Sequence, residues 1–157
     1  MKNFLTAKHS QKRSIVRYHK LIMLVMAIIG TVTFGYSQED NTKSITVTIE
    51  NIHNNKGHVI LSLHNEDTFM KSEGIQSKSK DIVDGKITAI FSGVAPGNYA
   101  ILAIHDENDN KRMDFEDNGM PIESYGMSNN SMSFGPPQFE SAKFELSTED
   151  LEVTIIF

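Results

Sequence analysis

Phe91-Ser-Gly-Val-Ala-Pro-Gly-Asn-Tyr-Ala-Ile-Leu-Ala-Ile-His-Asp106 is the stretch of sequence that decides the fold. At its centre, Pro96 fixes φ and Gly97 can take a positive φ, a combination typical of a turn between two strands. Every residue from Tyr99 to Ile104 is apolar. An apolar run of this length, directly after a turn, predicts a central strand that is covered on both faces.

Alternating apolar and polar residues on both sides of this stretch predict further strands. The alternation is clear at 45–50, resumes at 59–63 and 86–91, and returns near the end at 142–146 and 151–157. The first two runs are separated by Asn54-Asn55-Lys56-Gly57, whose residues tolerate positive φ, so we expect them to form a β-hairpin. The polar segment 66–84 is expected to be a long connection that Phe69 and Ile75 pin to the core.

No segment has a sustained helical period, which predicts an all-β fold. Six or seven short strands with turn-rich connections favour an antiparallel β-sandwich of about seven strands, transthyretin-like or immunoglobulin-like, with long ordered loops at one end. A small closed barrel is the alternative. The chain of 157 residues is long enough for one such domain, which we place at 45–157.

The N-terminal segment has the order of features found in a secretory signal peptide. Its six basic residues precede any acidic residue, an uncharged apolar run follows from Leu21 to Gly35, and the small Ser37 precedes Gln38. The run is shorter than the roughly 20 residues of a spanning helix, although an uncleaved anchor is the alternative. We therefore expect a signal peptide at 1–37, a disordered lead at 38–44, and an exported protein, periplasmic or extracellular, with no membrane span after cleavage.

The remaining chain is strongly acidic. Residues 38–157 carry nine Lys or Arg and all twenty Asp and Glu, a net charge of −11. Such a charge repels nucleic acid and anionic lipid and attracts cations, so we expect no nucleic-acid partner. The sequence contains no Cys, which excludes disulfides, a lipid-modified Cys and Cys-ligated zinc.

The stretch 105–121, HDENDNKRMDFEDNGMP, holds six carboxylates and only two basic residues, a local charge of −4. Calcium loops place oxygen ligands at alternate positions, and the candidate metal ligands with that spacing are Asp106, Asn108, Asn110, Asp114 and Asp117. If Asp106 is counted as position one of this frame of alternate ligands, position six, where Gly is preferred, is Lys111. A second frame of alternate ligands would begin with Asp114 as its position one. The alternative is a metal-free loop whose Asn and Asp side chains cap backbone N–H groups.

The same carboxylates suggest a hydrolytic alternative. A small periplasmic hydrolase, or a carbohydrate-active protein, would use Asp106 or Glu123 together with His105. If neighbouring strands brought His64 close to His105 and Asp106, the three side chains would form a metal or general-base site. No nucleophile elbow, metalloprotease motif or phosphate-binding loop occurs in the sequence, so an enzymatic role is the less favoured reading.

The segment 125–139 combines Gly and Pro with apolar bulk. Tyr125, Asn129, Asn130 and Phe134 pair aromatic rings with amides, a combination suited to a protein or glycan partner. The alternative is an ordered loop that packs over the open end of the sandwich. Both predict that this segment lies close to the acidic loop, because it follows that loop almost directly.

Three sequence blocks, "PGNYAILAIHDENDN", "GMPIESYGMSNN" and "FGPPQFESAKFEL", resemble in the same order the exported bacterial family catalogued as domain of unknown function 2141. The stretch 91–106 also resembles transthyretin-like and carboxypeptidase-regulatory-like sandwiches, in which it would form one hairpin. The exported family of unknown function 2141 usually has Gly or a small residue in its acidic loop where this chain has Lys111-Arg112. The resemblance implies a secreted all-β module without an established activity.

Together these features predict an exported, non-enzymatic β-sandwich module. Its acidic loop is a candidate for bound Ca²⁺, and no other cofactor is expected. Its long loops are candidates for an interaction surface.

Overall fold

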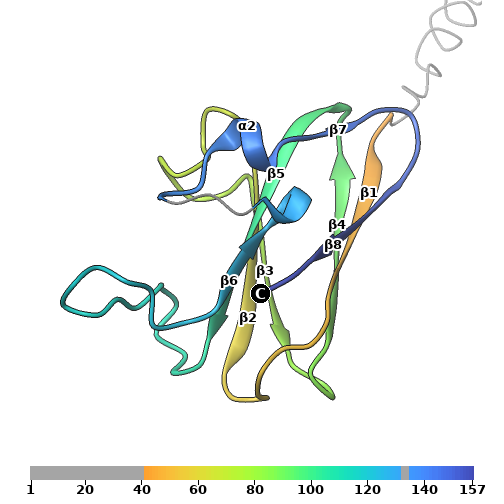
Figure 1. Cartoon of the computed structure of the whole chain (residues 1–157). Coiled ribbons are helices and arrows are strands. Elements are labelled where there is room, and N and C mark those ends of the chain that lie inside the picture. Colours follow the sequence, from red (N-terminus) through yellow and green to blue (C-terminus); the bar gives the residue numbers. More distant parts are fainter. Residues whose placement is uncertain (1–40, 132–134) are drawn as a thin grey trace, which may run out of the picture. The chain divides into compact units, whose positions relative to one another are not determined.

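The computed structural model describes residues 41–131 and 135–157, and this part of the chain is built almost entirely of strands (Figure 1). The elements in chain order are β1 (Lys43–Ile49), β2 (His58–His64), β3 (Gln76–Asp81), β4 (Ile87–Val94), β5 (Gly97–Asp106), β6 (Tyr125–Met127), the 3₁₀ turn η1 (Ser128–Asn130), the short helix α2 (Phe139–Ala142), β7 (Phe144–Leu146) and β8 (Leu151–Ile155).

The predicted signal peptide, residues 1–37, lies outside the described residues. The lead expected at 38–44 overlaps the first strand, because β1 begins at Lys43. Within the described ranges, no helix has the length and apolar character needed to cross a membrane.

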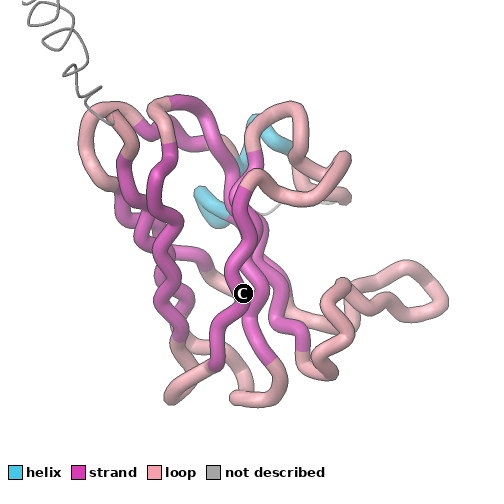
Figure 2. The backbone as a smooth tube through the Cα atoms, turned by 180° about the vertical axis from the view of Figure 1, so that it is seen from behind, coloured by secondary structure: helices cyan, strands magenta, loops and turns pink. Residues whose placement is uncertain are grey.

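The strands form two facing sheets, which confirms the predicted β-sandwich (Figure 2). One sheet has the order β4-β1-β8, and the other has the order β3-β2-β5-β6 with β7 also paired to β5. All pairs are antiparallel except β1 with β8, which run parallel. A parallel pair needs a long connection, and these two strands have almost the whole domain between them.

The core lies between the sheets and follows the alternation in the sequence. On β1, residues Ile45, Val47 and Ile49 are fully buried, while the residues between them are only partly buried. The facing sheet contributes Val59, Leu61, Leu63, Ile101 and Ala103. Period-two alternation places one set of side chains on each face, so this part of the prediction is confirmed.

The predicted β1–β2 hairpin is wrong, because the two strands belong to different sheets. The connection between them buries Ile52, whose N–H donates to the carbonyl of Gly85 over 2.9 Å. An apolar residue inside this loop thus anchors it at the end of the sandwich, where the chain crosses from one sheet to the other. Alternation shows which side chains are buried, but it does not show which strand is the neighbour.

The stretch 91–106 is likewise a corner between sheets instead of the hairpin that the transthyretin-like resemblance implied. Strand β4 lies in one sheet and β5 in the other. The Tyr99 hydroxyl donates to the carbonyl of Ala95 over 2.9 Å and so ties the start of β5 back to the turn. A Cβ on Gly97 would lie 3.3 Å from the Tyr99 ring, so the small residue lets the ring close over the corner.

Strand β5 is covered on both faces, as its uniform apolar character predicts. Ile101 and Ala103 point into the main core. Ala100 lies in a second cluster with Phe69, Met127 and Ala142, against which Leu102 and Phe139 pack. Phe69 therefore pins its segment as expected, whereas Ile75 does not, since its side chain is 44% exposed.

Candidate functional site: the acidic loop

The loop between β5 and β6 projects away from the sandwich, as both backbone views show (Figures 1 and 2). Its base is Asp106, which is only 1% exposed. The Asp106 carboxylate accepts the N–H of Asn110 on Oδ1 (3.0 Å) and the N–H of Lys111 on Oδ2 (2.8 Å). The side chain thus holds the following five residues in a tight turn. Each carboxylate oxygen keeps a further lone pair.

Three predicted ligands come together on this turn. The amide nitrogens of Asn108 and Asn110 lie 2.6 and 2.7 Å from the same oxygen, Oδ2 of Asp114. Asn108 Oδ1 also accepts the N–H of Asn110, and Asn110 Oδ1 accepts the N–H of Arg112. Residues at positions three, five and nine of the predicted frame therefore converge, next to the turn that position one holds.

The backbone at position six of this frame has the conformation that the frame requires. Lys111 has a φ of 65°, the left-handed region in which a side chain costs energy and Gly does not. At position six, the departure from a calcium loop is thus one of residue type and not of backbone shape.

Asp117 lies apart from this cluster. Residues Asp114 to Ile122 form a small hairpin, in which Ile122 N–H donates to the carbonyl of Asp114 and Glu116 N–H donates to that of Met120. Asp117 occupies the exposed tip of this hairpin. The predicted spacing assumed that residues 106–117 form one continuous loop, whereas residues from Asp114 to Ile122 form a separate hairpin.

Glu123 occupies the base of the loop instead. It is buried, and its two oxygens accept the N–H groups of Glu107 (3.0 Å) and Asp114 (3.1 Å). This carboxylate therefore joins the two arms of the loop, a role that the spacing did not identify. The available signal was its position directly after the acidic run, beyond Pro121.

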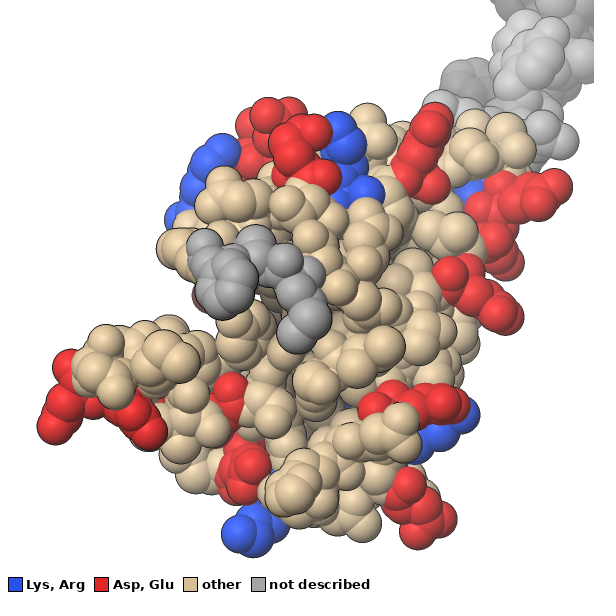
Figure 3. Space-filling view, viewed as in Figure 1, with Lys and Arg blue, Asp and Glu red and all other residues tan. Residues whose placement is uncertain are grey.

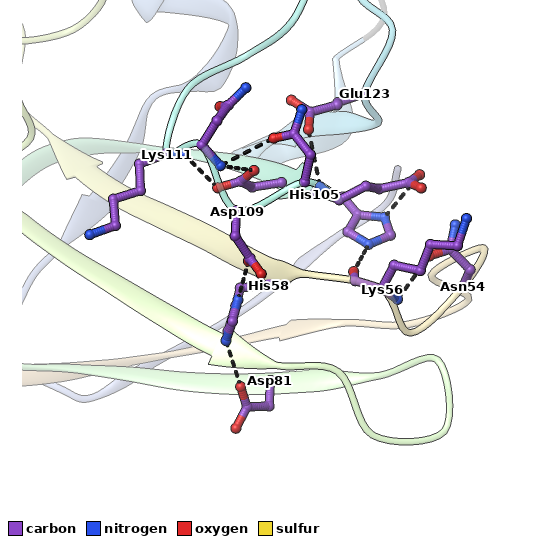
Figure 4. Close-up of polar contacts among 12 residues, drawn as sticks. Asn54, Lys56, His58, Asp81, His105, Asp109, Lys111 and Glu123 are labelled. Atoms are coloured by element: carbon purple, nitrogen blue, oxygen red, sulfur yellow. Dashed lines mark hydrogen bonds and ion pairs between the residues drawn. The ribbon is translucent and has the colours of Figure 1, made fainter.

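His58 links the acidic loop to the sheet edge (Figure 4). Its Nε2 lies 2.9 Å from Asp81 on β3, and its Nδ1 contacts Asp109 in the loop. The hydrogen bond to Asp109 and that residue's charge raise the pKa of His58 above the usual 6.5. The protonated imidazole thus binds a carboxylate on each side.

The predicted grouping of His64 with His105 and Asp106 does not form. Along the β2–β5 ladder His64 is opposite Ala100, while His58 is opposite Asp106. His105 is fully buried, its Nε2–H donates to the carbonyl of Lys56 over 2.8 Å, and its ring stacks on Phe157. Burial lowers the pKa of His64. The histidines are therefore spread along the sheet.

In the segment after β6, the side-chain amides of Asn129 and Asn130 form hydrogen bonds to the backbone of the protein itself. The Asn129 amide donates to the carbonyl of Lys143 over 2.7 Å. Asn130 donates to the carbonyl of Thr154 and accepts the N–H of Ile156, which fastens this segment to the edge of β8. Tyr125 is 42% exposed and borders a pocket of about 300 Å³ that Asn130 and Phe157 also line. Phe134 lies outside the described residues.

Within residues 41–131 and 135–157, no three His, Cys, Asp or Glu side chains are grouped so that they could hold a metal ion. Any cation site in the acidic loop therefore needs the amide oxygens of Asn108 and Asn110 beside the carboxylates, and these amides, whose nitrogens face Asp114, would have to turn to supply them. Amide and carboxylate oxygens suit a hard cation such as Ca²⁺ and are poor donors for softer metals.

Residues 47–154 match the family model described as an uncharacterized protein conserved in bacteria, DUF2141. The chain belongs to this family. The match covers both sheets and the acidic loop of the DUF2141 domain, and it confirms the family resemblance that the three sequence blocks indicated.

Comparison of the DUF2141 chain with curated proteins gives no significant match. Among solved structures, it is similar to a pilus-presented adhesin, Spy0125 (Cpa), with 16% sequence identity and a TM-score of 0.24. That alignment covers 73% of this chain and 26% of the adhesin chain, so this chain spans about a quarter of the adhesin's length.

Proposed function

We propose that this DUF2141 protein is an exported, non-enzymatic β-sandwich module whose acidic loop binds Ca²⁺ and whose neighbouring loops form an interaction surface. The observation that carries the proposal is the convergence of Asn108, Asn110 and Asp114 beside the turn held by Asp106. These four residues would hold the ion through oxygen atoms once Asn108 and Asn110 turn their amide groups, whose nitrogens now face Asp114. The bound ion would neutralise the loop and fix its shape.

Export and calcium binding support each other. The fluid outside the cytoplasm can supply millimolar Ca²⁺, so a site with a dissociation constant of about 10⁻⁴–10⁻³ M would fill there. The sequence before Gln38 supports export through its basic, apolar and small segments. Mass spectrometry of the exported protein is expected to find Gln38 at the N-terminus. A protein that retains residues 1–37 would contradict signal cleavage.

Thermal unfolding with Ca²⁺ or with EGTA tests the calcium site. A ligand that binds only the folded state at about tenfold excess over its dissociation constant stabilises that state by roughly 1.4 kcal/mol, which raises Tm by a few degrees. We expect Asp114→Asn to abolish this shift and the matched surface change Asp67→Asn to preserve it. Equal Tm values for the original protein in millimolar Ca²⁺ and in EGTA would contradict the proposal.

Two further variants identify the last carboxylate of the site. The sequence frame assigns Asp117, while the geometry favours Glu123, which is buried at the base of the loop. We expect Glu123→Gln to reduce the calcium-dependent shift and Asp117→Asn to leave it unchanged. The reverse result would mean that the hairpin folds back onto the ion when calcium binds.

The non-enzymatic part of the proposal is supported by the position of the histidine. A general base must reach its substrate, and His105 is buried beneath Phe157 with its Nε2–H bonded to a backbone carbonyl. Asp106 is also buried and binds backbone N–H groups. A hydrolytic activity that is lost in His105→Gln while folding is retained would contradict this conclusion.

The proposed interaction surface centres on Tyr125. The amides of Asn129 and Asn130 bond to backbone groups, so the exposed phenol is the part that remains available to a protein or glycan partner. An aromatic face beside a shallow pocket is suited to a sugar ring or an apolar side chain. Glycan-array binding that persists in Tyr125→Ala would place any glycan site elsewhere.

A further inference from the structure

The hairpin from Asp114 to Ile122 exposes large apolar side chains at the end of a projecting loop. Phe115, Met120 and Ile122 are 58%, 62% and 63% exposed. Single exposed apolar residues are common on protein surfaces, but three of them on one projecting hairpin make it a candidate contact site. These three side chains do not belong to either core cluster of the sandwich.

The hairpin is held in shape before any partner arrives. Its two arms pair at Phe115 and Pro121, and Gly119 N–H donates to the carbonyl of Glu116 over 2.8 Å at the tip. Asn118 Oδ1 accepts the N–H of Met120, also at 2.8 Å. A preformed projection loses little conformational entropy on binding, so the apolar side chains are presented on a defined backbone.

A pocket at the base of the hairpin indicates the chemistry of the partner. Its volume is about 420 Å³, and its lining combines apolar and anionic groups: Glu107, Asn108, Asp114, Phe115, Ile122 and Glu123. Acidic side chains flank the exposed hairpin (Figure 3), and residues 113–124 contain four acids and no Lys or Arg. A Lys or Arg side chain matches this lining, because its apolar stem packs on hydrocarbon while its charged head meets carboxylates.

We infer that this hairpin and its pocket dock a polypeptide segment of a partner protein that carries Lys or Arg next to aliphatic residues. Charge complementarity favours this occupant. An anionic membrane would be repelled by the acidic hairpin, and a second copy of the chain would bring like charges together. The inference goes beyond the proposed Tyr125 surface. Its pocket shares Asn108, Asp114 and Glu123 with the proposed calcium site, so a basic side chain and Ca²⁺ would compete there.

The test uses a short synthetic peptide of alternating Lys and Leu as the probe. The protein is purified after export of the full chain and titrated in EGTA, so that the result does not depend on calcium binding. We expect saturable binding that falls roughly tenfold or more in Phe115→Ser/Ile122→Ser, the typical effect of removing central apolar contacts. The matched change Val83→Ser/Ile90→Ser, at exposed positions outside the hairpin, is expected to leave affinity unchanged.

A second variant tests the charged part of the pocket without touching the hairpin. Glu107→Gln is expected to weaken peptide binding severalfold, while Glu149→Gln, an exposed acid elsewhere, is expected to have no effect. Equal affinity in all variants, or equal binding of a Glu and Leu peptide, would overturn the inference. Binding to phosphatidylglycerol vesicles but not to the peptide would instead indicate a membrane as the partner. A dimer that dissociates in Phe115→Ser/Ile122→Ser would instead indicate a second copy of the chain.

Discussion

The sandwich and the acidic loop are stabilised by opposite means. Between the sheets, branched apolar side chains exclude water completely, and residues such as Ile45, Leu61 and Phe91 have no exposed surface. In the loop, carboxylate and amide side chains satisfy backbone N–H groups, with Asp106 and Glu123 at the base. Hydrophobic burial responds little to ions or pH, whereas a charged hydrogen-bonded loop responds to both. The sandwich core therefore maintains the fold, while the acidic loop is the part that can respond to ions and pH.

The largest effect is expected from the sandwich. Phe91→Ala removes the largest fully buried side chain, which typically costs about 3–5 kcal/mol of unfolding free energy. Urea unfolding should give the same loss in Ca²⁺ and in EGTA, because Phe91 lies on β4, in the sheet opposite β5 and β6, which flank the acidic loop. A surface change such as Val83→Ala serves as the control. A calcium-dependent loss for Phe91→Ala would remove the distinction between the two regions.

A smaller loss is expected where a buried polar residue lies next to the second core cluster. Buried Ser128 accepts the N–H of Ile101 over 2.9 Å and donates to the carbonyl of Ala142. Ser128→Ala leaves both backbone groups without a partner and should cost about 1–3 kcal/mol. The exposed Ser79→Ala is the matched control in urea unfolding. Equal stability of the two variants would mean that water replaces the hydroxyl.

The loop itself is expected to gain stability from one substitution. Lys111 holds a left-handed backbone at φ 65°, which costs a side-chain-bearing residue roughly 1–2 kcal/mol. Lys111→Gly should therefore stabilise the protein by about 1 kcal/mol after allowance for the greater freedom of Gly when unfolded. Lys80→Gly in β3 should instead destabilise it. Destabilisation by both changes would show that Lys111 contributes contacts of its own.

The smallest effect concerns pH. The hydrogen bond and charge of Asp109 raise the pKa of His58 in the folded protein. A raised pKa means that the folded state binds the proton more tightly, so this contribution is complete at low pH and is lost as the pH rises through the folded pKa. An NMR titration should find the pKa above 6.5 and lower in Asp109→Asn, with Asp67→Asn as the control. An identical His58 pKa in all three proteins would remove the link between loop and sheet.

The sequence predicts the strands that bury one face, because burial of alternate residues leaves a period of two. It fails at β3, whose segment Gln76–Asp81 lies at a sheet edge with mostly exposed polar side chains. It also fails to assign strands to sheets, since alternation carries no information about neighbours. That is why β1 and β2 were expected to pair and instead face each other across the core.

The hydrogen-bonded cluster in the acidic loop was predictable to the extent that it is local. Alternate spacing correctly groups Asn108, Asn110 and Asp114, because a tight turn depends on residues a few positions apart. The positions of Asp117 and Glu123 depend on the hairpin from Asp114 to Ile122, which takes Asp117 to its tip and leaves Glu123 at the base of the loop. The spacing of residues does not predict this hairpin. Burial of His105 likewise depends on Phe157, which comes from the end of the chain.

Titration of the isotope-labelled protein with Ca²⁺, followed by amide NMR signals, tests the central claim most directly. The claim is that one folded turn, and not a diffuse negative surface, receives the cation. We expect saturable shifts at millimolar Ca²⁺ confined to residues 106–114, to Glu123 and to His58, which contacts Asp109, with the signals of β1 and β4 unmoved. Unchanged loop signals, or small unsaturable shifts spread over acidic residues throughout the protein, would contradict it.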